Sequence, residues 1–216
     1  MPVTELGASG PLSPTLARAV AQLRAGRPVI LCDAGSREDE GDLAFAAGTC
    51  TPELVNFTLS NARGVLCISM PPATAARIGV QRLAANGGDP MGTPFGYPVS
   101  VVGHGSGVSA ASRCATIRAV ADEASRPEDF AKPGHIATLI AHPGGVRARD
   151  GHTEAILDLL RIAGIPGPGV LCEILAPSGE IAGRAELAKL SEEHGLPILD
   201  IAEVVAHLAL ADAEAT

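Results

Sequence analysis

Acidic side chains crowd one short segment, in which Arg37 precedes Glu38, Asp39, Glu40 and Asp42. Four carboxylates within five residues repel one another unless a cation or an arginine lies among them. Hard divalent cations bind oxygen ligands, usually one or two carboxylates with waters and substrate, and a guanidinium is well suited to phosphate. The segment therefore indicates a site for a divalent cation and a phosphate ester, although composition alone fits a solvated acidic loop equally well.

A second group of polar residues lies where a glycine-rich turn, beginning at Gly144, leads into a predicted helix. Arg149, Gly151, His152 and Thr153 follow this turn. The free N–H groups and the dipole of a helix N-terminus favour bound anions, and a neutral imidazole can bind a metal ion. The pattern predicts an anion site beside a metal ligand; the alternative is that Thr153 only caps the helix.

Two further residues are suited to proton transfer. Glu173 lies within an apolar run, where a carboxylate is unusual unless it is paired or functional. His135 follows Lys132-Pro133-Gly134 and comes just before another apolar run. Both side-chain types serve as general acids and bases. The alternatives are a solvated Glu173 at the edge of a sheet and a His135 in an ordinary surface turn.

The elements that must position these residues alternate along the chain. Short apolar runs predict strands at 29–32, 65–70, 99–102, 136–141 and 170–175. Helical spacing predicts helices at 15–25, 51–62, 109–121, 153–163, 184–194 and 201–211. We therefore expect a single α/β domain (α+β, with a mixed sheet) over residues 15–212, with helices packed on a central β-sheet, after a flexible N-terminus at 1–14.

Composition excludes several classes of function. The chain has 216 residues, a formal net charge of −8 and 2% aromatic residues, so it has neither the basic patch nor the stacking rings of a nucleic-acid binder. It contains no run of about 20 apolar residues and no signal-peptide pattern, so we expect a cytoplasmic protein without a membrane partner. The five cysteines include no C-x-x-C pair, and we expect Cys32, Cys67 and Cys172 to be buried in the core.

Almost the whole chain resembles the 3,4-dihydroxy-2-butanone 4-phosphate synthase family. The resemblance rests on stretches that occur in the family's order and at nearly its spacing. They are Arg37–Asp42, Gly107–Ala111, Arg126–Phe130, Lys132–His135, Gly144–Val146, Gly151–Ala155 and Gly169–Glu173. The resemblance implies an α/β domain, a homodimer with active sites at the interface, and Mg²⁺ or Mn²⁺ as cofactor. It also implies a lyase that converts D-ribulose 5-phosphate to formate and L-3,4-dihydroxy-2-butanone 4-phosphate for riboflavin biosynthesis.

The resemblance also implies a role for each matching residue. Glu38 and His152 would hold the metal, and His135 and Glu173 would be the acid–base pair. Cys67 would lie near the reacting groups. The residues that would contact the sugar-phosphate substrate are Arg37, Asp42, Thr93, Ser106, Arg149 and Thr153. Some relatives carry a fused cyclohydrolase domain, and we expect none here.

The chain departs from the family pattern in loops that face the substrate. The family's Asp-Asp-Glu-Asp before the arginine is Asp33-Ala34-Gly35-Ser36, its aspartate in Ser-Ala-x-Asp-Arg is Ser112, and its Asn-Thr-Ala-Phe-Thr is 92–96. These changes leave two alternatives open beside the synthase: a diverged enzyme acting on another ketose phosphate or performing partial chemistry, and a catalytically dead sugar-phosphate-binding protein. Retention of the metal and acid–base residues speaks against the dead protein.

Overall fold

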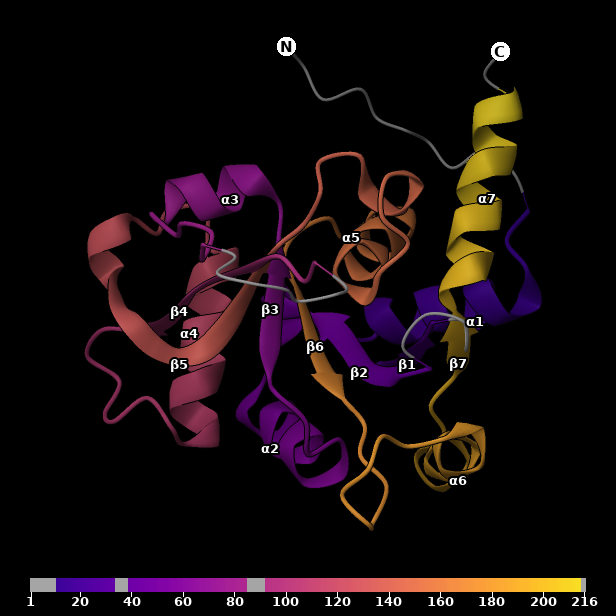
Figure 1. Ribbon diagram of the computed structural model, residues 1–216, viewed down its shortest axis with the longest axis horizontal. Helices are drawn as coiled ribbons and strands as arrows, with labels where there is room; N and C mark the ends of the chain where they lie inside the picture. The colour runs from indigo at the N-terminus through magenta and orange to yellow at the C-terminus, as the bar shows by residue number, and fades with distance from the viewer. Residues whose placement is uncertain (1–10, 34–38, 85–91, 215–216) are drawn as a thin grey trace.

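A seven-stranded mixed sheet forms the centre of the structure, a computed structural model that describes residues 11–33, 39–84 and 92–214. The strands lie in the order β4-β5-β3-β6-β2-β1-β7 (Figure 1). Their bounds are β1 Val29–Cys32, β2 Gly41–Ala46, β3 Cys67–Met70, β4 Phe95–Val101, β5 Phe130–Ile140, β6 Gly169–Glu173 and β7 Ile198–Asp200. The helices are α1 Pro14–Arg24, α2 Pro52–Asn61, α3 Pro72–Arg77, α4 Ala110–Ala121, α5 His152–Ile162, α6 Arg184–His194 and α7 Ile201–Glu214. The predicted class, helices packed on a central mixed sheet, is confirmed.

The pairing of the central strands brings distant acidic residues together. β2 runs antiparallel to both β1 and β6, while β3 is antiparallel to β6 and parallel to β5. In the β2–β6 ladder, Asp42 lies directly opposite Glu173. Residues directly opposite in an antiparallel pair present their side chains to the same face of the sheet. The ladder therefore places two carboxylates, 131 positions apart by number, side by side on one face.

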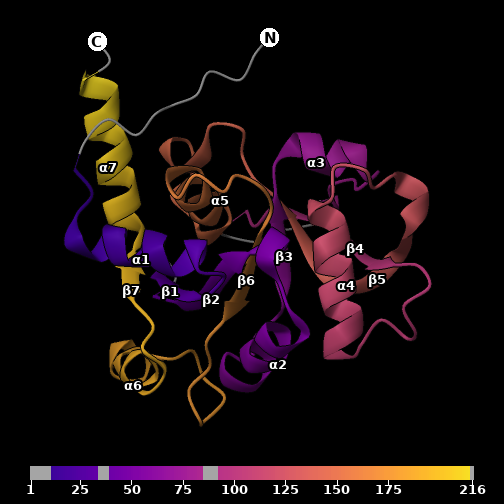
Figure 2. The same cartoon turned by 180° about the vertical axis from the view of Figure 1, so that it is seen from behind.

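Helix α5 covers the face of the sheet to which Glu173 points. It contacts β1, β2, β3 and β6 and lies beside α1 and α7, while α4 packs on β4 and β5 next to α2 (Figures 1 and 2). A Cβ atom at Gly169 would lie 2.4 Å from Ile156 Cγ1, so only glycine allows α5 to approach β6 this closely. Because strand side chains alternate, Gly169, Leu171 and Glu173 share the α5 face. The N-terminus of α5 thus lies over the carboxylate pair.

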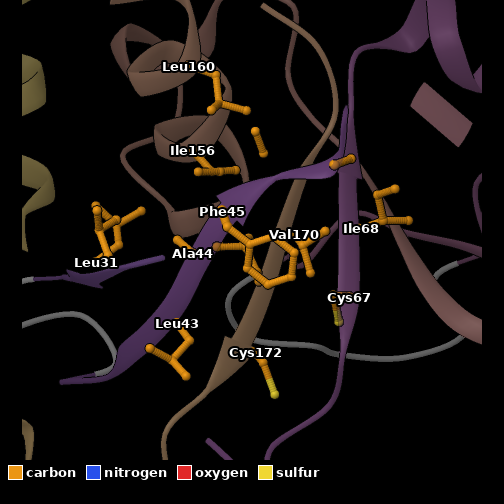
Figure 3. Packing of buried hydrophobic residues seen from close by; sticks show 14 of the residues in the cluster. Leu31, Leu43, Ala44, Phe45, Cys67, Ile68, Ile156, Leu160, Val170 and Cys172 are labelled. Carbon is orange, nitrogen blue, oxygen red and sulfur yellow. The ribbon is translucent and has the colours of Figure 1, made fainter. Parts of the chain in front are cut away.

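Aliphatic side chains fill the space between α5 and the sheet. Ile156 and Leu160 on α5 pack on the face of the sheet to which Ala44 points, whereas Phe45, Ile68 and Val170 point to the opposite face; all are fully buried (Figure 3). Every residue of β1, β2 and β3 is buried, as expected for strands covered on both faces. The composition predicted this aliphatic core. It provides a rigid base for the polar residues at the strand ends.

Local signals define the helix starts. Ser13 Oγ accepts the Leu16 N–H at the start of α1, and Thr51 Oγ1 accepts the Leu54 N–H at the start of α2. Ser109 caps α4 in the same way, through the Ser112 N–H. Each hydroxyl satisfies one of the free N–H groups of its helix. Residues 1–10 of the predicted N-terminal segment lie outside the described residues. In the part of the chain that is described, no helix has the length and apolar character to cross a membrane.

Three elements were not predicted from the sequence. β2 begins within the acidic segment, and the charged residues of that segment do not give the apolar pattern of a buried strand, although every residue of β2 is buried. β7 is three residues long and α3 six, too short to give a periodic pattern. β5 begins at Phe130 rather than at the predicted residue 136, because its first half pairs with the end of β4 across two register shifts. The predicted helices begin and end within a few residues of the observed ones.

Candidate active site

A cavity of about 320 Å³ opens at the N-terminus of α5, next to the carboxylate pair. Its polar lining residues are Glu40, Asp42, Thr93, Arg149, His152, Thr153 and Glu173. Its remaining lining residues are Cys67, Phe95, Leu139 and Leu171. Most residues predicted to act in the site therefore line one cavity, although they come from five regions of the chain. The apolar wall of Phe95, Leu139 and Leu171 was not predicted, because apolar residues in a strand are usually interpreted as part of the hydrophobic core.

Glu173 is held in a fixed orientation at the end of β6. Its Oε2 accepts the Val65 N–H at 2.7 Å, and its carbonyl accepts the Gly64 N–H at 3.0 Å. The residue lies between β2 and β3 in the interior of the sheet and is half-buried. The alternative of a solvated carboxylate at the edge of the sheet is therefore wrong. Glu173 faces the cavity with one oxygen already held by the backbone.

Replacing Gly64 by alanine is expected to displace Glu173. A Cβ at position 64 would lie 2.5 Å from both the carbonyl oxygen and Oε2 of Glu173, closer than real Cβ contacts occur. We expect turnover to fall about tenfold or more, because misplacement of about 1 Å costs a reactive group about 100-fold. Gly48, where a Cβ meets nothing within 4 Å, is the matched control. Equal kinetics for the Gly64→Ala and Gly48→Ala variants would contradict this expectation.

Asp42 and His152 approach each other across the cavity. Asp42 is buried, and its Oδ1 lies 4.0 Å from His152 Nε2. The same imidazole nitrogen lies 3.2 Å from the carbonyl oxygen of Leu31. His152 is the first residue of α5, after Gly151 at the N-cap. The side chain predicted as a metal ligand is thus adjacent to a buried carboxylate and to the end of β1.

Thr153 does not cap α5, so the alternative reading of this motif as plain capping by Thr153 is wrong. Gly151 occupies the N-cap position without a side-chain bond, and Thr153 lies within the first turn. The Thr153 carbonyl accepts the Ser69 hydroxyl at 2.7 Å, which fixes the first turn of α5 to β3. The Thr153 side chain lines the cavity. The free N–H groups of the first turn add partial positive charge there.

Arg149 is held beside the cavity by a buried carboxylate. Its Nη1 donates to Glu154 Oε2 at 2.8 Å, and Glu154 Oε1 accepts the His142 N–H at 2.8 Å. Glu154 is fully buried, while the Arg149 side chain is 21% exposed. The sequence indicated the turn from Gly151 to Glu154 as part of the site, but no separate role was predicted for Glu154. Its full burial and its charged partner show that it orients Arg149.

Two hydrogen bonds join Asp33 to Glu40. Asp33 Oδ1 accepts the Glu40 N–H at 2.8 Å, and the Asp33 N–H donates to the Glu40 carbonyl at 3.2 Å. Glu40 lines the cavity. Arg37 and Glu38, predicted as substrate and metal contacts, lie outside the described residues.

Two predicted site residues in the described part of the chain are not among those lining this cavity. Ser106 is exposed in the connection between β4 and α4, and His135 is exposed on β5. His135 is exposed but lies within β5 rather than in the surface turn of the alternative, and its ring is held, because its Nδ1 lies 3.0 Å from Ser100 Oγ. A single chain therefore gathers Glu173 and His152 in one cavity without gathering His135.

Cys67 lines the cavity as a buried thiol. Burial, followed by the charges of Glu173 and Asp42, raises the pKa of the Cys67 thiol well above its usual range. The same causes raise the pKa of Cys172 to about 12. The expected burial of Cys32, Cys67 and Cys172 is confirmed. A thiol held protonated in this way is a weak nucleophile.

The cysteines are expected to resist alkylation in the folded protein. A thiol with a pKa of about 12, such as that of Cys172, is roughly one part in 10,000 thiolate at pH 8, and thiolate is the reactive form. Iodoacetamide labelling at pH 8, followed by mass spectrometry of the peptides, checks this. The same chain in urea is the control and should be labelled rapidly. Fast labelling of Cys67 in the folded chain would show that its thiol is accessible and ionised.

The donor set of the cavity fits a hard divalent cation. Among the described residues that line it, Glu40, Asp42 and Glu173 bring three carboxylates, against the guanidinium of Arg149. Carboxylates gathered in this way favour a bound cation, and oxygen ligands suit Mg²⁺. Within the described ranges, which leave out Glu38, no three His, Cys, Asp or Glu side chains are grouped closely enough to hold a metal ion by themselves.

Comparison with known proteins identifies the family. The model of the 3,4-dihydroxy-2-butanone 4-phosphate synthase family matches residues 17–207. The chain belongs to this family. The resemblance inferred from the motifs is thereby confirmed over almost the whole chain.

Relatives and solved structures agree with this assignment. The chain is 44% identical over 191 residues to riboflavin biosynthesis protein RibBA of Mycobacterium ulcerans, covering 87% of this chain and 45% of that protein. It is 41% identical over 195 residues to the RibBA of Rhodococcus jostii, covering 89% of this chain and 47% of that protein. The chain thus spans about half the length of these curated relatives.

The fold matches solved synthases closely. RibBX of A. baumannii, a two-domain 3,4-dihydroxy-2-butanone 4-phosphate synthase, superposes with a TM-score of 0.84 at 39% identity, over 88% of this chain and 56% of that one. A synthase in complex with two magnesium ions superposes with a TM-score of 0.85 at 29% identity, over 89% of this chain and 95% of that one. The second comparison aligns almost the whole of both chains.

Proposed function

We propose that the chain is a lyase that converts D-ribulose 5-phosphate to formate and L-3,4-dihydroxy-2-butanone 4-phosphate in riboflavin biosynthesis. One observation carries the proposal. Asp42 and Glu173, paired across β2 and β6, share one cavity with Arg149, His152 and Thr153 at the N-terminus of α5. Family membership supports the reaction.

A divalent cation, Mg²⁺ or Mn²⁺, is part of the proposal. His152, beside buried Asp42, and Glu38 in the acidic segment would hold it, and the carboxylates of the cavity fit its charge. When bound, it would supply positive charge where negative charge develops on the substrate oxygens. A related synthase, 29% identical, has been solved with two magnesium ions.

The protein's own residues would bind the sugar phosphate and move its protons. Arg149 and the first-turn N–H groups of α5 suit the phosphate, with Arg37 as a further guanidinium. Asp42, Thr93 and Thr153 suit the sugar hydroxyls. Glu173 would exchange protons with the carbon chain, with its free oxygen toward the cavity. The reaction needs several such transfers, since an enediol forms, water is lost, a carbon shifts and formate leaves.

A homodimer with its active sites at the interface is also part of the proposal. His135 and Ser106, matched to the family's site residues, are exposed and do not line the cavity of their own chain. Exposed apolar side chains lie close to them in the sequence: Tyr97 on β4 and Val102 and Val108 in the connection that follows. Such residues at the edge of a sheet suit a protein partner. A second copy would cover them and bring His135 and Ser106 to the cavity.

Formate release tests the proposed function. The purified protein is incubated with D-ribulose 5-phosphate and Mg²⁺, and formate is followed with a coupled dehydrogenase. We expect formate in proportion to enzyme, none after chelation with EDTA, and recovery when Mg²⁺ is restored. Tight substrate binding without formate would favour the sugar-phosphate-binding protein, and consumption of substrate without formate would favour a diverged enzyme.

A further inference from the structure

We propose that Ser100 is a positioning residue that fixes the imidazole of His135 for proton transfer at Nε2. The inference rests on the proposed function, in which His135 is one of the acid–base groups. Ser100 lies near the end of β4, and His135 lies on the adjacent strand β5. No feature of the serine in the sequence distinguishes it from an ordinary strand residue.

A single buried hydroxyl holds both the backbone and the ring of His135. Ser100 is 8% exposed, and its Oγ accepts the His135 N–H at 2.9 Å. The same Oγ lies 3.0 Å from His135 Nδ1. His135 itself is exposed. The bond at Nδ1 restrains the χ1 and χ2 angles of a side chain that solvent would otherwise leave free to rotate, and the bond to the N–H holds the backbone that carries it.

Two glycines make room for this arrangement. A Cβ at Gly107, where φ is +84°, would lie 2.5 Å from His135 Nδ1 and 2.9 Å from Ser100 Oγ. A Cβ at Gly134 would lie 2.0 Å from the backbone carbon of Val99. The β4–β5 ladder also changes register between Val99 and Ser100, which turns the serine toward the ring. The backbone at Gly107, at Gly134 and at Ser100 therefore leaves space for the exposed His135 imidazole.

A contribution to stability does not explain why the His135 ring is held in one orientation. An exposed histidine buries little apolar surface, so fixing its ring costs rotamer entropy and adds little to stability. A group that transfers protons does gain from being held, because the reacting atoms must be within hydrogen-bond reach. The fixed, solvent-facing ring thus indicates a functional requirement.

The chemistry of a hydroxyl suits both protonation states of the ring. A serine oxygen has two acceptor lone pairs and one proton. Ser100 Oγ can accept from the His135 backbone N–H and from Nδ1–H together, and Nδ1 keeps its proton whether Nε2 is bare or protonated. The ring consequently keeps one orientation while its charge changes, and proton exchange with the substrate falls to Nε2.

Two variants and one control test the inference. Ser100→Ala removes the hydroxyl, and Gly107→Ala keeps both side chains but crowds the contact between the serine hydroxyl and the ring. The control is Thr116→Val, because Thr116 Oγ1 is a buried hydroxyl that accepts a backbone N–H of the same strand, that of Val101, at 3.1 Å. Formate kinetics are measured for each, together with ring ¹⁵N spectra in which His135 is assigned by comparison with His135→Gln.

We expect kcat to fall about 10- to 100-fold in Ser100→Ala and Gly107→Ala, as when the partner that orients a functional histidine is removed. KM should stay within about twofold, and the His135 ¹⁵N shifts should move toward the average of its two tautomers. Thr116→Val should lose stability but keep its kcat and its His135 spectrum. Wild-type kcat and an unchanged His135 spectrum in Ser100→Ala would overturn the inference.

The measurements distinguish failure of the proposed function from failure of the positioning role of Ser100. If the wild type releases no formate, the proposed function fails and the role of Ser100 in it falls too. If the wild type is active and His135→Gln is inactive, but Ser100→Ala is fully active, only the inference fails. A kcat loss in Thr116→Val as large as that in Ser100→Ala would also overturn it, since general loosening of the strand would then explain both.

Discussion

Replacing Glu173 by glutamine is expected to reduce kcat for formate release by about 100- to 10,000-fold, the usual contribution of a general acid or base. Glutamine has nearly the same shape, and its amide oxygen can still accept the Val65 N–H that Glu173 Oε2 accepts at 2.7 Å. The position of the side chain should therefore be kept while its ability to take a proton is lost. The free energy of unfolding should change little.

Steady-state kinetics and urea unfolding of the Glu173→Gln variant check this expectation. Glu180→Gln, on an exposed turn residue, is the matched control and should retain full activity. A stable Glu173→Gln variant that releases formate at the wild-type rate would remove Glu173 from the proposed acid–base pair. If the Glu173→Gln variant is inactive because it is unfolded, the loss of activity reflects a structural role of Glu173 in the sheet rather than proton transfer.

Replacing Arg149 by methionine is expected to affect both stability and substrate binding. Glu154, fully buried, would lose the guanidinium that Nη1 now places 2.8 Å from its Oε2. Removing one partner of a buried ion pair costs about 3–5 kcal/mol, and we expect about 3 kcal/mol because the Arg149 side chain is 21% exposed. Loss of a charge-assisted bond to the substrate should raise KM roughly 10- to 150-fold, corresponding to about 1.5–3 kcal/mol.

Urea denaturation and substrate titration of Arg149→Met separate the two effects. Arg147→Met is the control, because Arg147 pairs with Asp212 at 2.7 Å on the surface, with side chains 34% and 52% exposed. Exposed pairs contribute about 0–1 kcal/mol, so this variant should be nearly as stable as the wild type. Equal stability losses in the two variants would show that Glu154 does not depend on Arg149.

Sequence patterns predicted the elements that carry strong periodicity. The apolar run at Val29–Cys32 is a strand at its predicted bounds, and the helix predicted at 184–194 has its predicted bounds too. The motif at Gly151 to Glu154 correctly indicated a helix N-terminus at a polar site. These signals are local, because capping residues and hydrophobic spacing depend only on neighbours along the chain.

The parts that could not be predicted depend on contacts between distant segments. The sequence does not show that Asp42 faces Glu173, because that pairing is set by the register of β2 on β6. The role of Glu154 depends on burial against the turn at His142, and that of Ser100 on the register shift beside His135. Roles for the individual residues of the site remain proposals.

Two departures from the family pattern have structural explanations. A Cβ at Gly96 would lie 2.6 Å from Thr138 Oγ1, so the hydroxyl of Thr138 occupies the space that a residue 96 side chain would need. Ser112, in place of the family's aspartate, is buried in the first turn of α4 and bonds Ser109 Oγ at 2.9 Å. It thereby completes the helix cap. Neither change removes a residue that lines the cavity.

The ladder between β2 and β6 also determines which changes of chain length the site can tolerate. Asp42 and Glu173 are placed by strand pairing, and Asp33 and Glu40 are joined by two backbone-anchored bonds. Residues added or removed between Asp33 and Glu40 would leave the two carboxylates opposite each other. One residue inserted after Asp42 within β2 would instead turn the aspartate to the other face of the sheet. The strand that follows Asp42 therefore tolerates no change in length, because its register places the two carboxylates on one face.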